Sequence, residues 1–225
     1  MRVFLRFFQV AAMAAAITAV SASAHAFGIG VRAGTTGIGG DVGWRIAPAT
    51  SLRLGYSALD WNHDVSTSDV RYDGRLKLSN LSGLVDFHPI GPLFRLTGGL
   101  VYNGTKFDAT GQPTGGTFTL GGRTYAASDI GSLSGTVKPG RSLAPYLGIG
   151  YGNVAGAGIN FYADLGVIFQ GRPRADLNAA CGPALSASAC AQLQGDVEAE
   201  EARLRDELRR LRYYPVLNLG FTIGF

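Results

Sequence analysis

Residues 213–225, which read YYPVLNLGFTIGF, constrain the fold of this chain more than any other stretch. Successive side chains of an extended strand point to opposite faces, so alternate residues share a face. One face of this stretch is apolar throughout and ends in an aromatic residue, whereas the other is small or polar and includes Asn218. This contrast is typical of a strand that separates lipid from the interior of a membrane barrel. The apolar face consists of Tyr213, Pro215, Leu217, Leu219, Phe221, Ile223 and Phe225.

The same two-faced alternation recurs in seven earlier stretches. In the fourth of them, Leu76 and Leu78 lie on one parity, while Leu81 and Val85 lie on the other. A β-bulge near Asn80 would keep the apolar residues on one face, so we expect one there. The seven stretches are residues 27–35, 38–46, 51–61, 75–88, 93–107, 143–152 and 159–170.

The connections between these strands alternate between short and long, which is the pattern of an up-and-down barrel with tight periplasmic turns and long external loops. The predicted fold class is therefore all-β, an antiparallel transmembrane β-barrel of eight strands. Ten strands are the alternative, if a hairpin formed by residues 117–120 and 123–126 joins the barrel. The predicted long loops are residues 62–74, 108–142 and 172–212, and the last contains an amphipathic helix over 187–212.

The first 26 residues predict a secretory signal peptide. Arg2 and Arg6 precede an apolar run, and Ala24-His25-Ala26 is a small-x-small site that places cleavage after Ala26. Residues 27–225 then form the barrel domain, and no stretch in them has the eighteen or so uninterrupted apolar residues that a transmembrane helix needs. The expected location is the outer membrane of a Gram-negative cell.

Composition limits the partners. The chain has 20 Lys and Arg residues against 16 Asp and Glu residues, and two of the cations leave with the signal peptide. This near-balance argues against a nucleic-acid partner, which needs a clustered basic surface. Cys181 and Cys190 lie close together in an exported chain, which favours a local disulfide.

A resemblance to a known family is carried by four strand and turn segments. They are similar to the units of small eight-stranded outer-membrane barrels, the group that contains the OmpA transmembrane domain and the opacity and OmpW-like proteins. In that group, a terminal aromatic residue with alternate apolar residues before it is read by the barrel-assembly machinery, which implies this role for Phe221, Ile223 and Phe225. No peptidoglycan-binding domain like that of OmpA follows Phe225, so a cell-wall tether is not expected. The segments read GGDVGWRIAPATSLRLGYSALDW, LVDFHPIGPLFRLTGGLVYN, APYLGIGYGN and PVLNLGFTIGF.

The inward faces of the predicted strands carry a polar set that is the candidate functional site. An eight-stranded barrel is about wide enough for side chains to fill it, and buried charges must be paired. We therefore expect a network that plugs the lumen, with a structural or surface-interaction role for the protein and a small porin as the alternative. The set consists of Arg32, Asp41, Arg45, Arg53, Lys77, Asp86, Arg95, Asn103, Asp164, Gln170 and Asn218.

Catalysis is not expected. A lipid-modifying barrel enzyme, the third hypothesis, needs a serine beside a histidine and an acid. After signal cleavage only His63 and His88 remain; His88 adjoins a predicted periplasmic turn, and the serine nearest to His63 is Ser66. Asp60 and Asp64 lack the spacing of a calcium-binding EF-hand, so neither a metal nor another cofactor is predicted. The expected partners are outer-membrane lipid and lipopolysaccharide, the assembly machinery and a surface ligand bound by the loops, and we expect a monomer.

Overall fold

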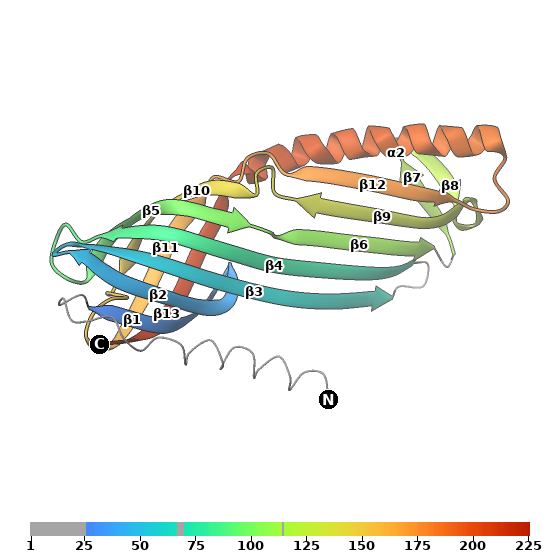
Figure 1. The fold of residues 1–225 in the computed structure, drawn as a ribbon. Coiled ribbons are helices and arrows are strands. Elements are labelled where there is room, and N and C mark those ends of the chain that lie inside the picture. The colour runs from blue at the N-terminus through green and yellow to red at the C-terminus, as the bar shows by residue number, and fades with distance from the viewer. Residues whose placement is uncertain (1–25, 67–69, 114) are drawn as a thin grey trace, which may run out of the picture.

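The computed structural model describes residues 26–66, 70–113 and 115–225, and its main feature is one antiparallel sheet of eleven strands (Figure 1). Eight of these strands close into a ring, in which β4 pairs with β5 and β1 pairs with β13. The expectation of eight strands in the ring is confirmed. In order around the ring, the strands are β1 (Phe27–Gly34), β2 (Gly37–Ala47), β3 (Thr50–Ser66), β4 (Val70–Phe87), β5 (Phe94–Asn103), β10 (Leu143–Tyr151), β11 (Gly158–Ile168) and β13 (Tyr214–Gly224).

The outer face of the ring is apolar, and the inner face carries polar, charged and small residues together with a buried apolar cluster. Along β13, Leu217, Leu219 and Phe221 are exposed by 52%, 50% and 58%, whereas Val216, which precedes them, and Asn218, which lies among them, are buried. Ile223 and Phe225 continue the exposed face to the end of the chain. Closure of the ring pairs every strand on both sides, which leaves no hydrogen-bonding edge around this apolar surface.

The sheet continues beyond one end of the ring as a flat extension. Asn80–Phe87 of β4 pair with β5, whereas Val70–Lys77 pair with β6 (Lys106–Pro113). The strands β9 (Ile130–Lys138) and β12 (Arg174–Cys181) follow β6 in the sheet. The segments 62–74, 108–142 and 172–212, which we expected to be long loops, also contain the ends of β3 and β4, the strands β6 and β9, and β12. We call β6, β9, β12 and the ends of β3 and β4 beside them the outer sheet.

The expected bulge near Asn80 is wrong. The pairing of β3 with β4 keeps one register from Thr50 opposite Phe87 to Ser66 opposite Arg71. The apolar residues change parity because their surroundings change: Leu81 lies on the outer face of the ring, while Leu78 lies on the inner face and is buried. Above the ring, the apolar side of the strand is therefore its inner side.

A hairpin and a helix pack on the outer sheet. The hairpin of β7 (Thr117–Leu120) and β8 (Arg123–Ala126) forms as predicted, but as a separate two-stranded sheet, so the ten-stranded alternative is wrong. Helix α2 (Ala187–Leu208) lies along the outer sheet (Figure 1) and continues in a 3-10 turn, Arg209–Arg212. No helix within the described ranges is long and apolar enough to cross a membrane.

The helix protects the free edge of β12. Gln194 donates to the Ala179 carbonyl at 2.8 Å, and Arg205 donates to the Ala175 carbonyl at 3.0 Å. Glu201 accepts from the Leu177 backbone N–H at 2.8 Å. Unpaired strand edges invite pairing with other chains, so these side chains satisfy groups that would otherwise be available for such contacts.

A disulfide joins the helix to the edge strand. Cys181 ends β12 and Cys190 lies in the first turn of α2, and their Cα atoms are 5.7 Å apart. The bond therefore closes the short connection that brings the helix back along β12.

Candidate functional site in the interior of the ring

The inner face of the ring gathers most of the predicted polar set, and all but two of its members are buried. Arg45 is half-buried at the end of the ring, and Lys77 is exposed. Lys77 was assigned to the interior because of the expected bulge; without it, Lys77 lies on the outer face of β4, beyond the ring. The buried members are Arg32, Asp41, Arg53, Asp86, Arg95, Asn103, Asp164, Gln170 and Asn218.

Two arginines and two aspartates form the centre of the interior. Asp164 on β11 accepts from Arg53 at 2.7 Å and from Arg95 at 2.6 Å. Asp86 on β4 lies 3.0 Å from the Arg53 Nε and 3.6 Å from the Arg95 Nε, and it accepts from the Thr97 hydroxyl at 2.6 Å. The four charges cancel, which is the condition under which such groups can remain ionised without contact with water.

A second charge pair lies beside this centre. Arg32 on β1 donates to Asp41 on β2 at 2.8 Å, and the Tyr162 hydroxyl donates to the other oxygen of Asp41. Tyr162 is fully buried, and the Arg53 and Arg95 guanidinium carbons lie 5.8 and 5.3 Å from its ring centroid. The tyrosine therefore connects the two groups of charges through a hydrogen bond and cation-π contacts.

An apolar layer fills the adjacent part of the interior. It is contributed by five strands and packs directly above the ion pairs. A cavity of about 20 Å³ remains between this layer and the polar side chains of Arg32, Asn80 and Asn218, which is room for about one water molecule. The layer consists of Leu84, Val101, Ala144, Tyr146, Ile168 and Val216.

Hydrogen bonds close the interior toward the outer sheet. The short turn between β1 and β2 contributes Thr36, whose hydroxyl donates to Asn218 and whose carbonyl accepts from Asn80 and Ser57. These contacts join the turn to three strands. On the other side, Asn103 donates to Gln170 at 3.1 Å, and Gln170 donates to the Leu211 carbonyl at 2.8 Å.

The opposite end of the ring is closed by the turn between β10 and β11, residues 152–157. Val154 and Ala155 in this turn are almost completely buried. Gly28 makes room for them, because a Cβ at Gly28 would lie 1.9 Å from the Val154 carbonyl oxygen. The Asn160 amide donates to the Gly156 carbonyl at 2.9 Å and holds the turn in this position.

Replacement of Gly28 by alanine is expected to displace this turn, since the added methyl group collides with backbone. A cysteine at Ala155 reports the displacement: labelling by a membrane-impermeant maleimide should be several-fold faster in the Gly28→Ala background than in its parent. Gly83→Ala is the matched control, because its Cβ would meet no atom closer than Leu54 at 3.7 Å. Equal labelling of Ala155→Cys in all three backgrounds would contradict the assignment of the turn as a plug.

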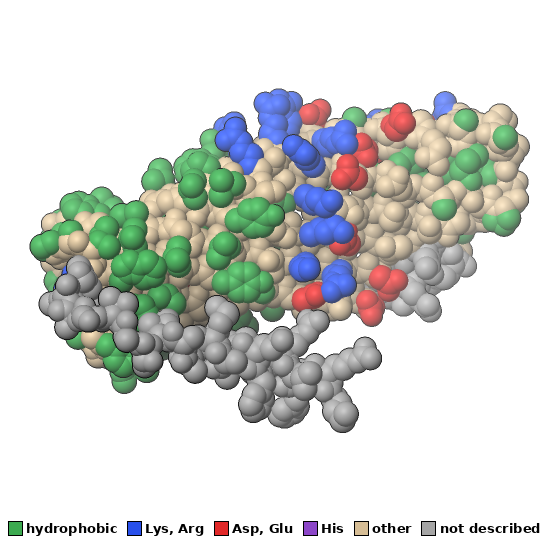
Figure 2. All heavy atoms as spheres, viewed as in Figure 1, with side chains coloured by type: hydrophobic (Ala, Val, Ile, Leu, Met, Phe, Trp, Pro, Cys, Tyr) green, Lys and Arg blue, Asp and Glu red, His purple; other side chains and the backbone are tan. Residues whose placement is uncertain are grey.

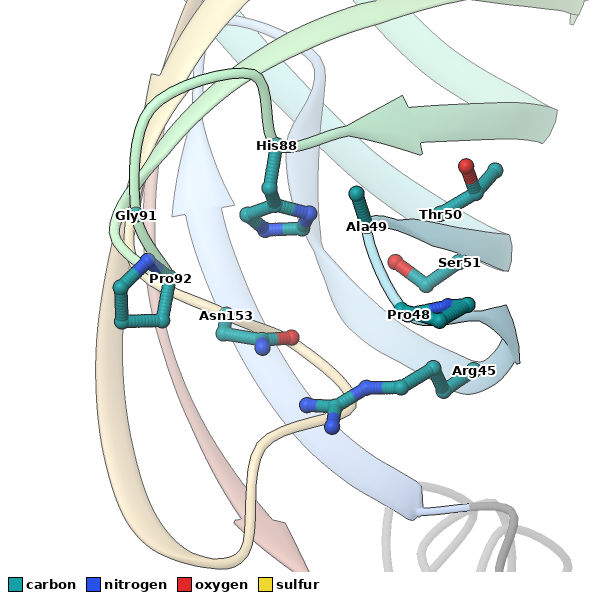
Figure 3. A pocket seen from close by; sticks show the side chains of 9 residues that line it. All are labelled: Arg45, Pro48, Ala49, Thr50, Ser51, His88, Gly91, Pro92 and Asn153. Carbon is teal, nitrogen blue, oxygen red and sulfur yellow. The ribbon is translucent and has the colours of Figure 1, made fainter.

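A shallow pocket lies outside this plug, at the same end of the ring. It has a volume of about 260 Å³, and in Figure 3 His88, Asn153 and Arg45 point toward a common space. Burial lowers the pKa of His88, so its imidazole is neutral at pH 7, and its Nε2 makes no hydrogen bond within the described ranges. Because this nitrogen is itself buried, it is not available to a molecule in the pocket.

Sequence reasoning missed several interior residues. The predicted polar set does not include Tyr162, and no role in closing the ring is predicted for the 152–157 turn. One feature of the sequence could have indicated the plug. The turn contains two apolar residues, Val154 and Ala155, and inward-facing glycines such as Gly28 and Gly43 leave room for them. No three His, Cys, Asp or Glu side chains gather as metal ligands in the part of the chain that the structure describes.

Comparison with known proteins relates this geometry to a class of folds. No protein-family model and no curated protein matches the sequence. Among solved structures, CarO2 of Acinetobacter baumannii is similar, with a TM-score of 0.57 and 19% identity over 89% of this chain and 98% of that one. CarO of the same organism gives a TM-score of 0.53 and 20% identity over 88% of this chain and 97% of that one.

A third solved structure, a major outer membrane protein from Thermus thermophilus, gives a TM-score of 0.43 and 16% identity over 90% of this chain and 100% of that one. CarO and CarO2 are outer-membrane barrel proteins. The chain therefore has the fold of outer-membrane β-barrel proteins.

Proposed function

We propose that this chain is an exported outer-membrane barrel protein with a closed lumen and a structural or surface-interaction role. The observation that carries the proposal is the contrast between the two faces of one ring. The outer face exposes rows of Leu, Ile, Val and aromatic side chains, while the inner face buries ion pairs. In water such an apolar surface would promote association, whereas in a bilayer it contacts lipid.

The orientation follows from the lengths of the connections. The turns at one end, residues 48–49, 88–93 and 152–157, are short, and the outer sheet rises from the other end. Outer-membrane barrels have short periplasmic turns and longer external segments. We therefore place Phe27 and Phe225, which pair with each other at the end with the short turns, in the periplasm.

The contacts inside the ring favour a closed lumen over a small porin. An ion passing through would have to separate the Arg53, Arg95, Asp86 and Asp164 cluster, cross the apolar layer, and displace the 152–157 turn. The remaining cavity is about 20 Å³. A surface role then falls to the outer sheet, the hairpin and α2, which offer the ordered surface farthest from the membrane.

Cell fractionation with gel electrophoresis and planar-bilayer recording test the proposal in two steps. The native protein should appear in the outer-membrane fraction, and boiling should shift its mobility, because folded barrels resist detergent at low temperature. The refolded protein should then show no large, persistent single-channel currents. A soluble protein without a mobility shift would contradict the membrane assignment, and stable currents would instead support the porin.

A further inference from the structure

Four basic residues stand side by side across the outer sheet. Lys77 on β4 is directly opposite Lys106 on β6, and Lys138 on β9 is directly opposite Arg174 on β12. Phe107 on β6 is opposite Val137 on β9. The next residues in the same register, Lys106 and Lys138, are therefore also opposite each other. The four residues therefore share one face and form a row across adjacent strands, which we call the cation row. At about 4.8 Å per strand, it is roughly 14 Å long.

Nearby acids offset only part of the charge of the cation row. Partial burial opposes ionisation of Asp108, but its pair with Lys106 at 2.9 Å and the Thr136 hydroxyl hold the pKa of this carboxyl below its ordinary value. Asp108 therefore stays charged; it forms a direct ion pair with Lys106 and also attracts Lys138 at longer range. Asp60 lies directly opposite Lys77 and forms an ion pair with Arg75, and Asp176 lies 3.7 Å from Arg205.

Three members of the row are left without a direct ion pair. Lys77, Lys138 and Arg174 are exposed and make no ion pair within the described ranges. Like charges directly opposite each other destabilise a sheet, so the row costs stability unless an external anion occupies it.

The cation row follows the edge of the apolar face. On β4, Lys77 is four residues beyond Leu81, and on the neighbouring chain segment Lys106 is four residues beyond Tyr102. Leu81 and Tyr102 are opposite each other, and on the outer face of these two segments they are the last exposed apolar residues before the lysines. Four residues of strand span about 13 Å, which places the charges at the depth of the polar headgroups if the apolar face lies in hydrocarbon. Figure 2 shows a band of basic side chains between the apolar surface and the outer part of the molecule.

We propose that the cation row binds the phosphate groups of lipopolysaccharide in the outer leaflet. This rests on the proposed function, because the depth of the row has meaning only if the ring spans the outer membrane. Phosphate groups at the membrane surface provide the anions that the row lacks, and each cation near an anionic surface adds to the attraction. Arg141 and Arg172, which are exposed beside the row, extend it toward β10.

Thermal unfolding of the full chain in lipid-free detergent micelles, with added lipid A, tests the proposal. A ligand that binds only the folded state raises the unfolding temperature, so diphosphorylated lipid A should stabilise the native protein. The double variant Lys138→Gln/Arg174→Gln should need at least about tenfold more lipid A for the same rise. Without lipid A, this variant should be at least as stable as its parent, because a repulsion has been removed.

Two controls define the outcome. Arg123→Gln/Arg203→Gln removes two exposed cations from the outer part of the protein away from the row, and it should respond to lipid A as the parent does. Inorganic phosphate at equal concentration should have no effect; an equal rise would assign the row to free phosphate and overturn the lipid proposal. An equal response of the Lys138→Gln/Arg174→Gln protein would overturn it as well. The boiling-dependent mobility shift of the same samples tests the barrel separately, so a shift without any lipid A response would refute this inference alone.

Discussion

Replacement of Asp164 by asparagine is expected to lower the free energy of unfolding of the ring by about 3–5 kcal/mol. Asp164 is the shared acceptor of Arg53 and Arg95, and all three side chains are buried. An amide cannot balance their charge, so two buried cations would share the single carboxylate of Asp86. Unfolding by guanidinium chloride in micelles, followed by gel mobility, measures the change.

Two further variants separate lost charge balance from lost packing. Arg95→Gln added to Asp164→Asn leaves one buried cation opposite one buried anion, and should recover part of the lost stability in a double-mutant cycle. Asp206→Asn removes an acid from an exposed pair with Arg209 and should have little effect, since surface ion pairs contribute little. An Asp164→Asn protein as stable as its parent would contradict the central role of the ion pairs.

Sequence alternation was sufficient to predict the ring because its two faces meet different environments. The strands of the ring place apolar residues outward and, apart from the apolar layer, small or polar residues inward, so a period of two identifies the strands and assigns their faces. The buried charges Arg53, Asp86, Arg95 and Asp164 were found in this way. Their pairing was not, because the partners lie on different strands and depend on the register of the whole ring.

The outer sheet escaped prediction for the same physical reason. Beyond the ring, the outer face of β4 carries Lys77 and Arg75, while the inner face carries Leu76 and Leu78. The alternation continues, but its apolar side has changed from outside to inside. A rule that requires one lipid-facing side interprets the change as a bulge, and it interprets the polar segments that follow as loops.

The apolar stripe of α2 predicted the helix but not its packing on the outer sheet. The apolar stripe predicted a helix over 187–212, and the disulfide was predicted from the spacing of two cysteines in an exported chain. The stripe did not distinguish a solvated helix from a packed one. Leu193 and Val197 are buried against the outer sheet, whereas Leu211 in the same stripe is 54% exposed. The side chains that cap β12 are polar, and so carry no apolar signal.

Replacement of Leu193 by alanine is expected to release α2 from the outer sheet without opening the ring. Leu193 is fully buried in a cluster with Leu120, Ile130, Ala179 and Val197, and truncation of such a side chain costs about 2–5 kcal/mol. Because the ring has its own packed interior, we expect this loss to appear as local opening of the outer part.

Limited trypsin digestion measures this opening through cleavage within residues 187–212, where several arginines are exposed. Cleavage should be faster in Leu193→Ala than in the parent, while the boiling-dependent mobility shift of the ring stays the same. Leu211→Ala is the matched control and should be cleaved at the rate of the parent, because its side chain lies outside the cluster. If Leu193→Ala abolished the mobility shift, the outer sheet and the ring would form one cooperative unit, and the helix would stabilise the barrel itself as well as the edge of β12.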